Sequence, residues 1–393
     1  MKKWPSTKID DICIRIAMGP FGSNIKVDNF VPSGVPVLNG SNLIGFKLKE
    51  DSFNYVTESK ADELKNSLAY KGDIVVTHRG TLGQIIYIPL ESKYDKYVIS
   101  QSQFLLRVNP DKADSRFITY FFHSAYGQYL LLSNASQVGV PALARPTSTF
   151  KSLEIPLPPL PIQKKIADFL CLVDEKIDIN TQINQNLEAQ AQAIFKSWFV
   201  DFEPFQDGKF VVSELGSIPE GWQIGTLKDI LEIHYGKDHK KLEDGIVPVY
   251  GSGGLMRYVN TALYSGESVL IPRKGTLNNV MRVTGNFWTV DTMFYSIPKC
   301  NGAAKLAFHL LKNMDLASMN SGSAVPSMTT DILNSIIIAI PSQQVLDSFD
   351  EITGSLWQLY EANNKINNSL ITLRDTLLPK LMSGEIDVSE VEV

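Results

Sequence analysis

A long stretch occurs twice in this sequence. Residues 158–199 and residues 341–381 align without a gap, so that Pro158 corresponds to Pro341. In both stretches apolar residues recur every three or four positions, which is the spacing of one face of a helix. A proline just before each run suits a helix start, because the N–H group that proline lacks would have no partner there. The sequence therefore predicts two long, related amphipathic helices.

The apolar face of each helix follows a heptad pattern. Its two core positions hold Ile166, Val173, Asn180, Leu187 and Ile194 with Leu170, Ile177, Asn184, Ala191 and Trp198 in the first helix, and Phe349, Leu356, Asn363, Leu370 and Leu377 with Thr353, Tyr360, Asn367, Arg374 and Leu381 in the second. A seam sustained over this length favours a coiled coil over a single surface helix.

A polar layer interrupts both seams at the same level. It consists of Asn180, Asn184, Asn363 and Asn367. Because a buried Asn without a partner costs roughly 1–3 kcal/mol, we expect these side chains to pair with each other. A central layer still matches its copy when one helix is reversed, so the helices can pair antiparallel within one chain. The alternative is that each helix packs only on its own domain.

The composition is that of an ordinary globular protein. The 393 residues are 44% hydrophobic and 20% charged, enough for two domains or more. No apolar run reaches the roughly 18 residues of a membrane span, and the N-terminus lacks the apolar core of a secretory signal. The three cysteines lie far apart, which argues against a metal site or a disulfide framework and predicts a cytoplasmic protein.

The net charge of −5 is unevenly distributed. Residues 1–150 carry 17 Lys and Arg against 13 Asp and Glu, and residues 216–338 carry 11 against 10. The helical stretches at 151–215 and 339–393 carry 6 against 10 and 3 against 9. A polyanionic partner would therefore meet the globular parts and not the helices. The alternative is ordinary charge scatter on solvated helix faces.

The duplication extends beyond the helices. Matching segments pair residues 4–12 with 222–230, 35–45 with 247–257, and 72–83 with 266–278. The predicted organisation is a globular domain at 1–157, a helix at 158–199, a connection at 200–220, a second globular domain at 221–340, and a distal helix with a C-terminal tail at 341–386.

The globular domains read as mixed structures with short strands and few helices. Two apolar segments on either side of a turn containing Gly83 predict a β-hairpin. Residues 117–133 and 305–314 are apolar at helical spacing, which predicts a helix in each copy. The predicted fold class is α+β: two mixed α/β domains separated by two long helices that form an antiparallel coiled coil, with an internal two-fold repeat.

No catalytic or metal-binding arrangement is visible in the sequence. The five histidines are scattered without the spacing of metal ligands. His123 and His309 lie inside apolar helical runs, where packed neutral histidines are the expected outcome. We therefore predict neither catalytic nor metal-binding residues.

Two further patterns resemble active-site motifs only superficially. Asp73, Glu91 and Lys93 could be read as a nuclease core, but the second copy has Glu267 without an acid-x-Lys match. The segment GPFGS at 19–23 lacks the ending of a phosphate loop. The chain therefore reads as non-catalytic.

Small polar and cationic residues gather on the predicted turns of both copies. They are Asn39, Ser41, Asn42, His78, Arg79 and Thr81 in the first copy, and Lys237, His239, Lys240, Ser252, Arg273, Lys274 and Thr276 in the second. Arg can bind guanine through two hydrogen bonds or grip a phosphate, and glycine lets the backbone approach closely. These residues are candidate DNA contacts. The alternative is a set of exposed turns that bind nothing.

This arrangement resembles the DNA-specificity (S) subunit of type I restriction–modification enzymes over essentially the whole chain. Residues 155–177 together with 194–205 (IFKSWFVDFEPF) are similar to the central regular region of that family, and residues 370–386 (LITLRDTLLPKLMSGEI) are similar to the distal one. Base-contacting positions vary within the family, so the candidate contacts rest on loop chemistry alone.

The resemblance implies two target-recognition domains that each read half of a split site in double-stranded DNA. It also implies that two methyltransferase (modification) subunits dock on the helices, carry S-adenosylmethionine and methylate adenine N6. A restriction subunit that uses ATP and Mg²⁺ would join them, while this chain binds no cofactor and no membrane.

Helix length agrees with this role. A helix over 162–199 would be roughly 57 Å long, enough to separate two readers by one DNA turn of about 34–36 Å. Because the loops of the two copies differ, an asymmetric target is expected. The competing hypotheses are a coiled-coil scaffold without direct DNA readout and a stand-alone nuclease or methyltransferase.

Overall fold

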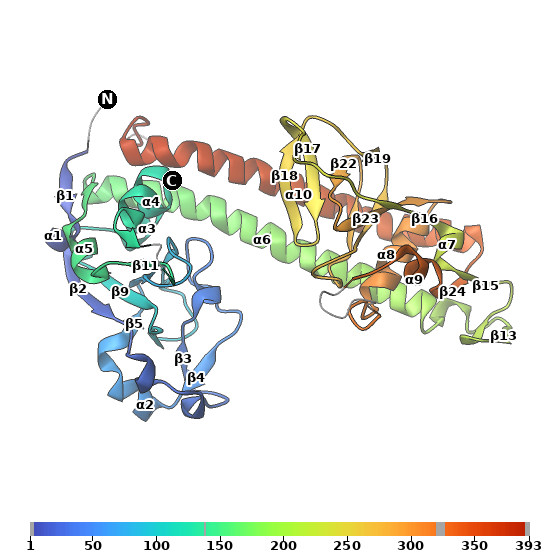
Figure 1. Ribbon diagram of the computed structural model, residues 1–393, viewed down its shortest axis with the longest axis horizontal. Coiled ribbons are helices and arrows are strands. Elements are labelled where there is room, and N and C mark those ends of the chain that lie inside the picture. Colours follow the sequence, from blue (N-terminus) through green and yellow to red (C-terminus); the bar gives the residue numbers. More distant parts are fainter. Residues whose placement is uncertain (1–3, 137–138, 320–326, 390–393) are drawn as a thin grey trace. The chain divides into compact units, whose positions relative to one another are not determined.

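The computed structural model describes residues 4–136, 139–319 and 327–389 (Figure 1). It consists of two units. The first comprises residues 1–179 and 366–393, and the second comprises residues 180–365. Each long helix contributes one part to each unit.

The first unit contains two four-stranded sheets. Their orders are β2-β9-β6-β7 (Cys13–Met18, Gln103–Val108, Ile74–Thr77 and Ile85–Tyr87) and β4-β3-β8-β5 (Asn54–Val56, Val35–Val37, Lys96–Val98 and Leu68–Tyr70). Two short antiparallel pairs accompany them, β1 with β12 (Ser6–Lys8 and Glu154–Pro156) and β10 with β11 (Ala135–Ser136 and Ala142–Leu143). The hairpin predicted around Gly83 is the β6–β7 pair.

The helices of the first globular part are short. They are α1 (Ile9–Ile12), α2 (Glu58–Glu63), α3 (Ser115–His123), α4 (Ala125–Leu132) and α5 (Pro146–Ser152). The single helix predicted over 117–133 is wrong in one respect, because Ser124 takes an extended conformation and separates α3 from α4. The Ser124 hydroxyl accepts a hydrogen bond from the N–H of Gly127 and so caps α4.

The second unit repeats this plan. Its sheets have the orders β16-β23-β20-β21 (Leu231–Tyr235, Met293–Pro298, Ser268–Pro272 and Met281–Val283) and β18-β17-β22-β19 (Gly254–Val259, Asp244–Gly251, Asn286–Thr289 and Tyr264–Ser265). The pairs β15–β24 (Gln223–Thr226 and Ile337–Ile340) and β13–β14 (Phe210–Ser213 and Gly216–Pro219), and the helices α7 (Leu227–Ile230), α8 (Ala303–Lys312) and α9 (Thr330–Asn334), complete it.

The repeat holds at the level of residue register. Each mixed sheet contains one parallel strand pair: β3 with β8, where Val37 pairs with Val98, and β17 with β22, where Val249 pairs with Trp288. These positions correspond when the matching segments are aligned. The predicted internal two-fold repeat is therefore confirmed.

The two long helices are α6 (Leu160–Phe199) and α10 (Gln343–Ser383). In the first unit Asp174 of α6 forms an ion pair with Arg374 of α10 at 2.7 Å. In the second unit the aromatic rings of Phe195 and Phe349 lie 6.5 Å apart. A second contact within each unit gives the direction: Asn367 bonds to Ile177 in the first unit, and Asn363 bonds to Asn184 in the second. In each unit the residue number falls along α10 as it rises along α6, so the helices pair antiparallel, as predicted.

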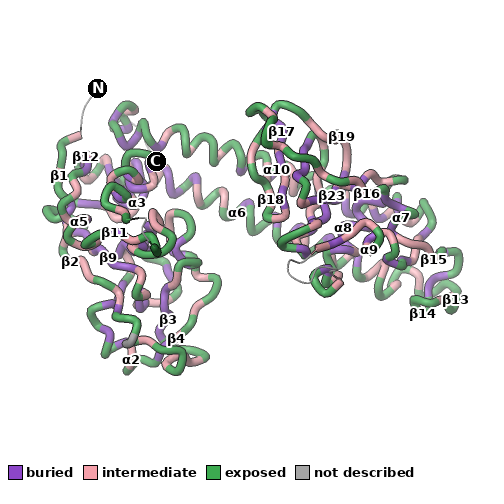
Figure 2. Tube along the Cα trace, in the orientation of Figure 1, coloured by how far each residue is buried: buried purple, intermediate pink, exposed green. Residues whose placement is uncertain are grey.

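The predicted heptad positions form the contact face of these helices. None of the twenty seam positions is exposed, and buried and exposed residues alternate along α6 and α10 (Figure 2). Seam residues also belong to the core of each unit: Ile166 and Leu170 to that of the first, and Ala191 and Phe349 to that of the second. The helices are therefore part of each unit's core.

Candidate nucleic-acid interface

In the second unit, loops that follow two strands of one sheet meet at a single turn, residues 289–293. The backbone N–H of Gly236, just after β16, donates to the carbonyl of Met293 at 2.9 Å, and that of the next residue, Lys237, donates to the carbonyl of Thr289 at 2.9 Å. The N–H of Arg273, just after β20, donates to the carbonyl of Thr292 at 2.8 Å. The turn thus fixes two predicted contact loops side by side.

The first unit builds the same arrangement around residues 99–103. The N–H of Gly19, after β2, donates to the carbonyl of Gln103 at 2.8 Å, and the N–H of His78, after β6, donates to that of Ser102 at 2.8 Å. We call residues 99–103 and 289–293 the loop-gathering turns.

A close backbone approach explains one glycine at each turn. A Cβ on Gly19 would overlap the carbonyl oxygen of Ser100, and a Cβ on Gly236 would overlap that of Val290. Only glycine fits at these two equivalent places. The segment 19–23, dismissed as a phosphate loop, therefore has a structural reason for its first glycine that sequence analysis did not find.

The small polar residues of the first copy mainly build their own turn. The Asn39 side chain accepts a hydrogen bond from the N–H of Ser41 at 2.9 Å. Asn42 is 2% exposed, and its amide donates to the carbonyls of Lys49 and Ser52, both at 3.0 Å. The hydrogen bonds of Asn42 are thus used within the fold, and of the three candidates on this turn Ser41 alone is exposed. We do not propose Asn42 as a DNA contact.

The loop after β6 in the first unit contains His78 and the exposed cation Arg79. The His78 ring is hydrogen-bonded to the carbonyl of Gln101 at 3.1 Å, and burial lowers the pKa of His78. This histidine is therefore neutral near pH 7. Arg79 and Thr81 are exposed, on either side of Gly80 with its positive φ of 91°. Arg79 has no carboxylate partner among the described residues.

In the second unit, the loop after β16 carries several basic side chains. Lys237 and Lys240 are exposed and His239 is half-buried. The indole N–H of Trp288 donates to the Lys237 carbonyl at 2.9 Å, which holds the backbone of this loop. The backbone N–H of Lys240 donates to Asp238, and this bond lowers the pKa of the Asp238 carboxyl group.

The remaining candidates of the second copy lie together. Ser252 is close to Gly275, since a Cβ on Gly275 would come 2.8 Å from the Ser252 hydroxyl. Its carbonyl accepts from the side chain of Asn279 at 2.9 Å. Lys274 and Thr276, on either side of Gly275, are exposed.

The guanidinium group of Arg273 has a fixed position. Its central carbon lies 5.4 Å from the ring centroid of Tyr235, and its Nη1 donates to the carbonyl of Asp291 at 3.2 Å. Tyr235, the last residue of β16, is 52% exposed and was not a candidate. In the sequence, Tyr235 could have been selected because it directly precedes the basic segment at 237–241.

Sequence analysis also missed Arg145. This exposed residue has φ 46°, in the left-handed region, and it precedes Pro146. Leu143, two residues before it, donates its N–H to the carbonyl of His78 at 2.8 Å, so Arg145 follows directly on the contact loop. Unfavourable backbone conformations of this kind are frequent at functional sites.

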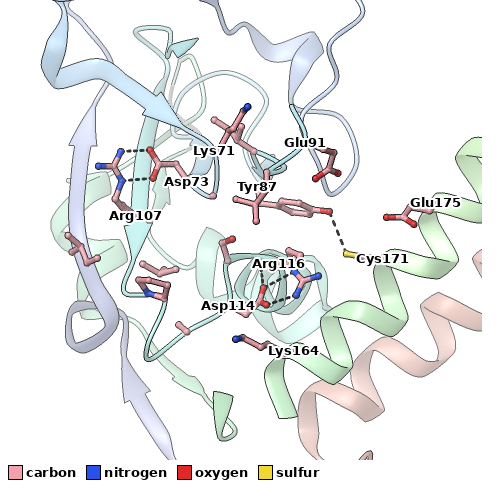
Figure 3. Close-up of a pocket in the computed structure, with 18 residues that line it drawn as sticks. Lys71, Asp73, Tyr87, Glu91, Arg107, Asp114, Arg116, Lys164, Cys171 and Glu175 are labelled. Atoms are coloured by element: carbon pink, nitrogen blue, oxygen red, sulfur yellow. Dashed lines mark hydrogen bonds and ion pairs between the residues drawn. The ribbon is translucent and has the colours of Figure 1, made fainter. Parts of the chain in front are cut away.

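A cavity of about 700 Å³ in the first unit contains the acids once considered for a nuclease (Figure 3). Both oxygens of Asp73 accept from the guanidinium of Arg107 at 2.7 Å, while Glu91 lies on the other side of Tyr87. Lys93 is not in the lining; its backbone N–H is bound by Glu50. Asp73, Glu91 and Lys93 therefore do not come together as the side chains of a nuclease core would.

Other polar side chains that line this cavity are also paired with each other. The Arg116 side chain forms ion pairs with Asp114 at 2.7 Å and Asp168 at 2.6 Å, and the Asp114 bond raises the pKa of Arg116. Burial raises the pKa values of Cys171 and of Tyr87, whose hydroxyl lies 3.5 Å from the thiol. A neutral thiol is a poor nucleophile.

The asparagine layer is hydrogen-bonded across the helices. The Asn363 amide donates to the Asn184 side-chain oxygen at 3.0 Å, and the Asn184 amide donates to the carbonyl of Tyr360 at 3.2 Å. Asn367 donates to the Ile177 carbonyl at 3.4 Å in the first unit. Asn180 is 1% exposed in the second.

Two features are absent from the residues that the structure describes. No described helix combines the length and the apolar character needed to cross a membrane. Within the same residues, no three His, Cys, Asp or Glu side chains are grouped as metal ligands would be.

Comparisons with known proteins point in one direction. The family described as "Type I restriction modification DNA specificity domain" matches residues 1–189 and 219–371. The type I restriction enzyme MjaIX specificity subunit of Methanocaldococcus jannaschii is 26% identical, covering 99% of this chain and 95% of that protein. The HindI specificity subunit of Haemophilus influenzae is 24% identical over 80% and 87%.

A solved structure shares the fold. It is the crystal structure of a type I restriction–modification system S subunit from M. genitalium, with a TM-score of 0.59, 20% sequence identity and 96% coverage of each chain. At this identity the likeness concerns the fold alone, and it agrees with the predicted α+β class.

Proposed function

The chain belongs to the type I restriction–modification DNA specificity family, and from this premise we propose that each unit reads one half of a bipartite, asymmetric site in double-stranded DNA. As a specificity subunit it is non-catalytic. The contact surface we assign in each unit is the set of loops held by its loop-gathering turn.

One observation carries this proposal: equivalent loops of both units present cations that no carboxylate neutralises. Lys237, Arg273 and Lys274 in the second unit, and Arg79 in the first, have no carboxylate ion pair among the described residues. Unpaired cations on backbone-anchored loops are suited to phosphates and base edges. The equivalent places carry different side chains, His78 against Arg273, which supports two different half-sites.

The partners we propose are two modification subunits docked on α6 and α10, with S-adenosylmethionine bound by them. A restriction subunit using ATP and Mg²⁺ would complete the assembly. Support comes from the outer face of α10, where Ile352, Leu359, Ile366 and Leu373 recur at heptad spacing and are each between 44% and 48% exposed. An exposed apolar stripe of this spacing suits a partner helix.

The test replaces Arg79 and Arg273 together by Ala in the full chain, assembled with the modification subunits of its host. We expect unchanged assembly, DNA affinity lowered about tenfold or more, and a weaker dependence of affinity on salt, because fewer counterions are released. Affinity is measured by titration at several salt concentrations, and assembly by gel filtration.

The matched control replaces Lys8 and Lys228 together by Ala; both are exposed and lie outside the loops held by the loop-gathering turns. It removes the same charge and should leave DNA affinity nearly unchanged. Unchanged affinity in the double Arg variant would favour a scaffold without DNA readout. Turnover of DNA by the pure chain with Mg²⁺ or S-adenosylmethionine would favour a stand-alone enzyme.

A further inference from the structure

We propose that Arg273 reads a guanine in the major groove, so that this guanine belongs to the half-site bound by the second unit. The inference rests on the proposed function and deepens it, because it assigns one base to one side chain of the loop-gathering turn.

The first reason is the way the Arg273 side chain is held. The ring of Tyr235 lies under the guanidinium at 5.4 Å, and the Asp291 carbonyl accepts from Nη1 at 3.2 Å. These two contacts restrict the positions that the guanidinium group can take. Its other N–H donors remain free, since no further hydrogen bond of the guanidinium is formed among the described residues. A planar fork held in this way loses little entropy when it binds.

The second reason is the chemistry of the base. Guanine presents two acceptors, N7 and O6, at its major-groove edge, and an arginine fork matches both. A phosphate contact does not require a fixed plane, and the exposed Lys274, the next residue, supplies a point charge for it. The pair of neighbouring residues therefore divides into a base reader and a backbone contact.

The third reason comes from the equivalent place in the first unit. His78 makes the same backbone bond to its turn, but its ring is spent on the Gln101 carbonyl. Met18 stands where the second unit has Tyr235, so nothing comparable supports a guanidinium there. The guanine is thus assigned to the second unit alone.

The experiment selects bound duplexes from a randomised library with the full chain assembled with its host's modification subunits. The wild type should enrich a split sequence. R273A should lose the preference for guanine at one position of one half-site, from roughly 5- to 150-fold to nearly none. The other half-site should be unchanged. R273K keeps the charge without the fork, and it should retain affinity but lose most of that discrimination.

Two control variants separate base reading from charge. K274A should weaken binding to all duplexes equally and keep the guanine preference, and R79A should leave the second unit's half-site unchanged. If R273A instead lowers affinity uniformly and keeps the guanine, Arg273 contacts a phosphate and the inference is overturned. If R273A does not assemble, R273K decides in the same way. A wild-type complex that enriches no sequence overturns the proposed function and this inference together.

Discussion

In each unit a cation of the globular part contacts a long helix at a corresponding position, but the cation and its burial differ. In the first unit Lys47 pairs with Asp178 of α6 at 2.7 Å, and the two side chains are 37% and 49% exposed. In the second, Arg282 is 8% exposed and pairs with Glu267 at 2.6 Å. It lies 4.7 Å from the ring centroid of Trp357 and 3.7 Å from Glu361, the α10 residue that corresponds to Asp178.

The two units share their backbone arrangement but not their side chains. Backbone hydrogen bonds at the loop-gathering turns and the parallel register of the mixed sheets are the same in both units. The side chains differ between the units, both on the loops held by these turns and at the ion pairs of Lys47 and Arg282, which we call the clamps. A shared backbone with different side chains is what two readers of different half-sites require.

The largest expected effect distinguishes the two clamps. Arg282→Met should destabilise the second unit by about 2–3 kcal/mol, because Glu267, whose side chain is only 25% exposed, loses its charged hydrogen-bond partner. Lys47→Met should cost the first unit less than about 1 kcal/mol, since solvent screens that exposed pair. Hydrogen–deuterium exchange in the full chain, read separately at β20 and β6, measures both. Equal losses would remove the contrast between a buried and an exposed clamp.

A second contrast concerns the helices α3 and α8. Tyr120 of α3 corresponds to His309 of α8. Burial, reinforced by the nearby cations Arg282, Lys305 and Lys312, lowers the pKa of His309 to about 3. Its ring is 0% exposed and accepts or donates one hydrogen bond, to Gln192 at 2.8 Å. The folded second unit therefore holds a neutral histidine well below the pH at which the unfolded chain protonates it.

The pH dependence follows from this shift. Between about pH 6.5 and pH 3 the unfolded state binds one proton more than the folded state, so the stabilisation is present above this window and is lost as pH falls. We expect the second unit to lose about 1.4 kcal/mol per pH unit from this residue. His309→Gln should flatten that slope. Burial raises the pKa of Tyr120, so this residue, unlike His309, takes up no proton in this window.

Unfolding by urea at pH 7, 6, 5 and 4 measures these slopes. Carboxylates contribute their own acid dependence, so only the difference between the variant and the wild type is interpreted. A His309→Gln chain with the wild-type slope would contradict the assignment.

Much of the fold could be predicted because the repeat tests each pattern twice. The heptad positions from Ile166 to Leu381 and the turn around Gly83 are local signals, and the structure uses them as predicted. The break at Ser124 was missed because apolar spacing continues across it, while the cap depends on a single hydroxyl.

The candidate site could be predicted less completely, because its geometry depends on distant backbone. Loop chemistry selected Arg79 and Arg273, which are presented by the loops. It also selected Asn42, whose amide is bound by carbonyls seven and ten residues away, and His78, bound to a carbonyl 23 residues away. Arg145 was not among the candidates, because its left-handed backbone angle cannot be inferred from composition.

The smallest expected effect lies in the asparagine layer that both long helices share. Asn184→Ala should cost about 1–2 kcal/mol, because it leaves the buried Asn363 amide without its acceptor. Replacing Asn184 and Asn363 together by Leu should recover stability, since no unpaired polar group remains, but it should loosen the register of the helices. Cysteine crosslinking along α6 and α10 measures that register. A double Leu variant that crosslinks in one register only would mean that the clamps of the two units, and not the asparagines, align the helices.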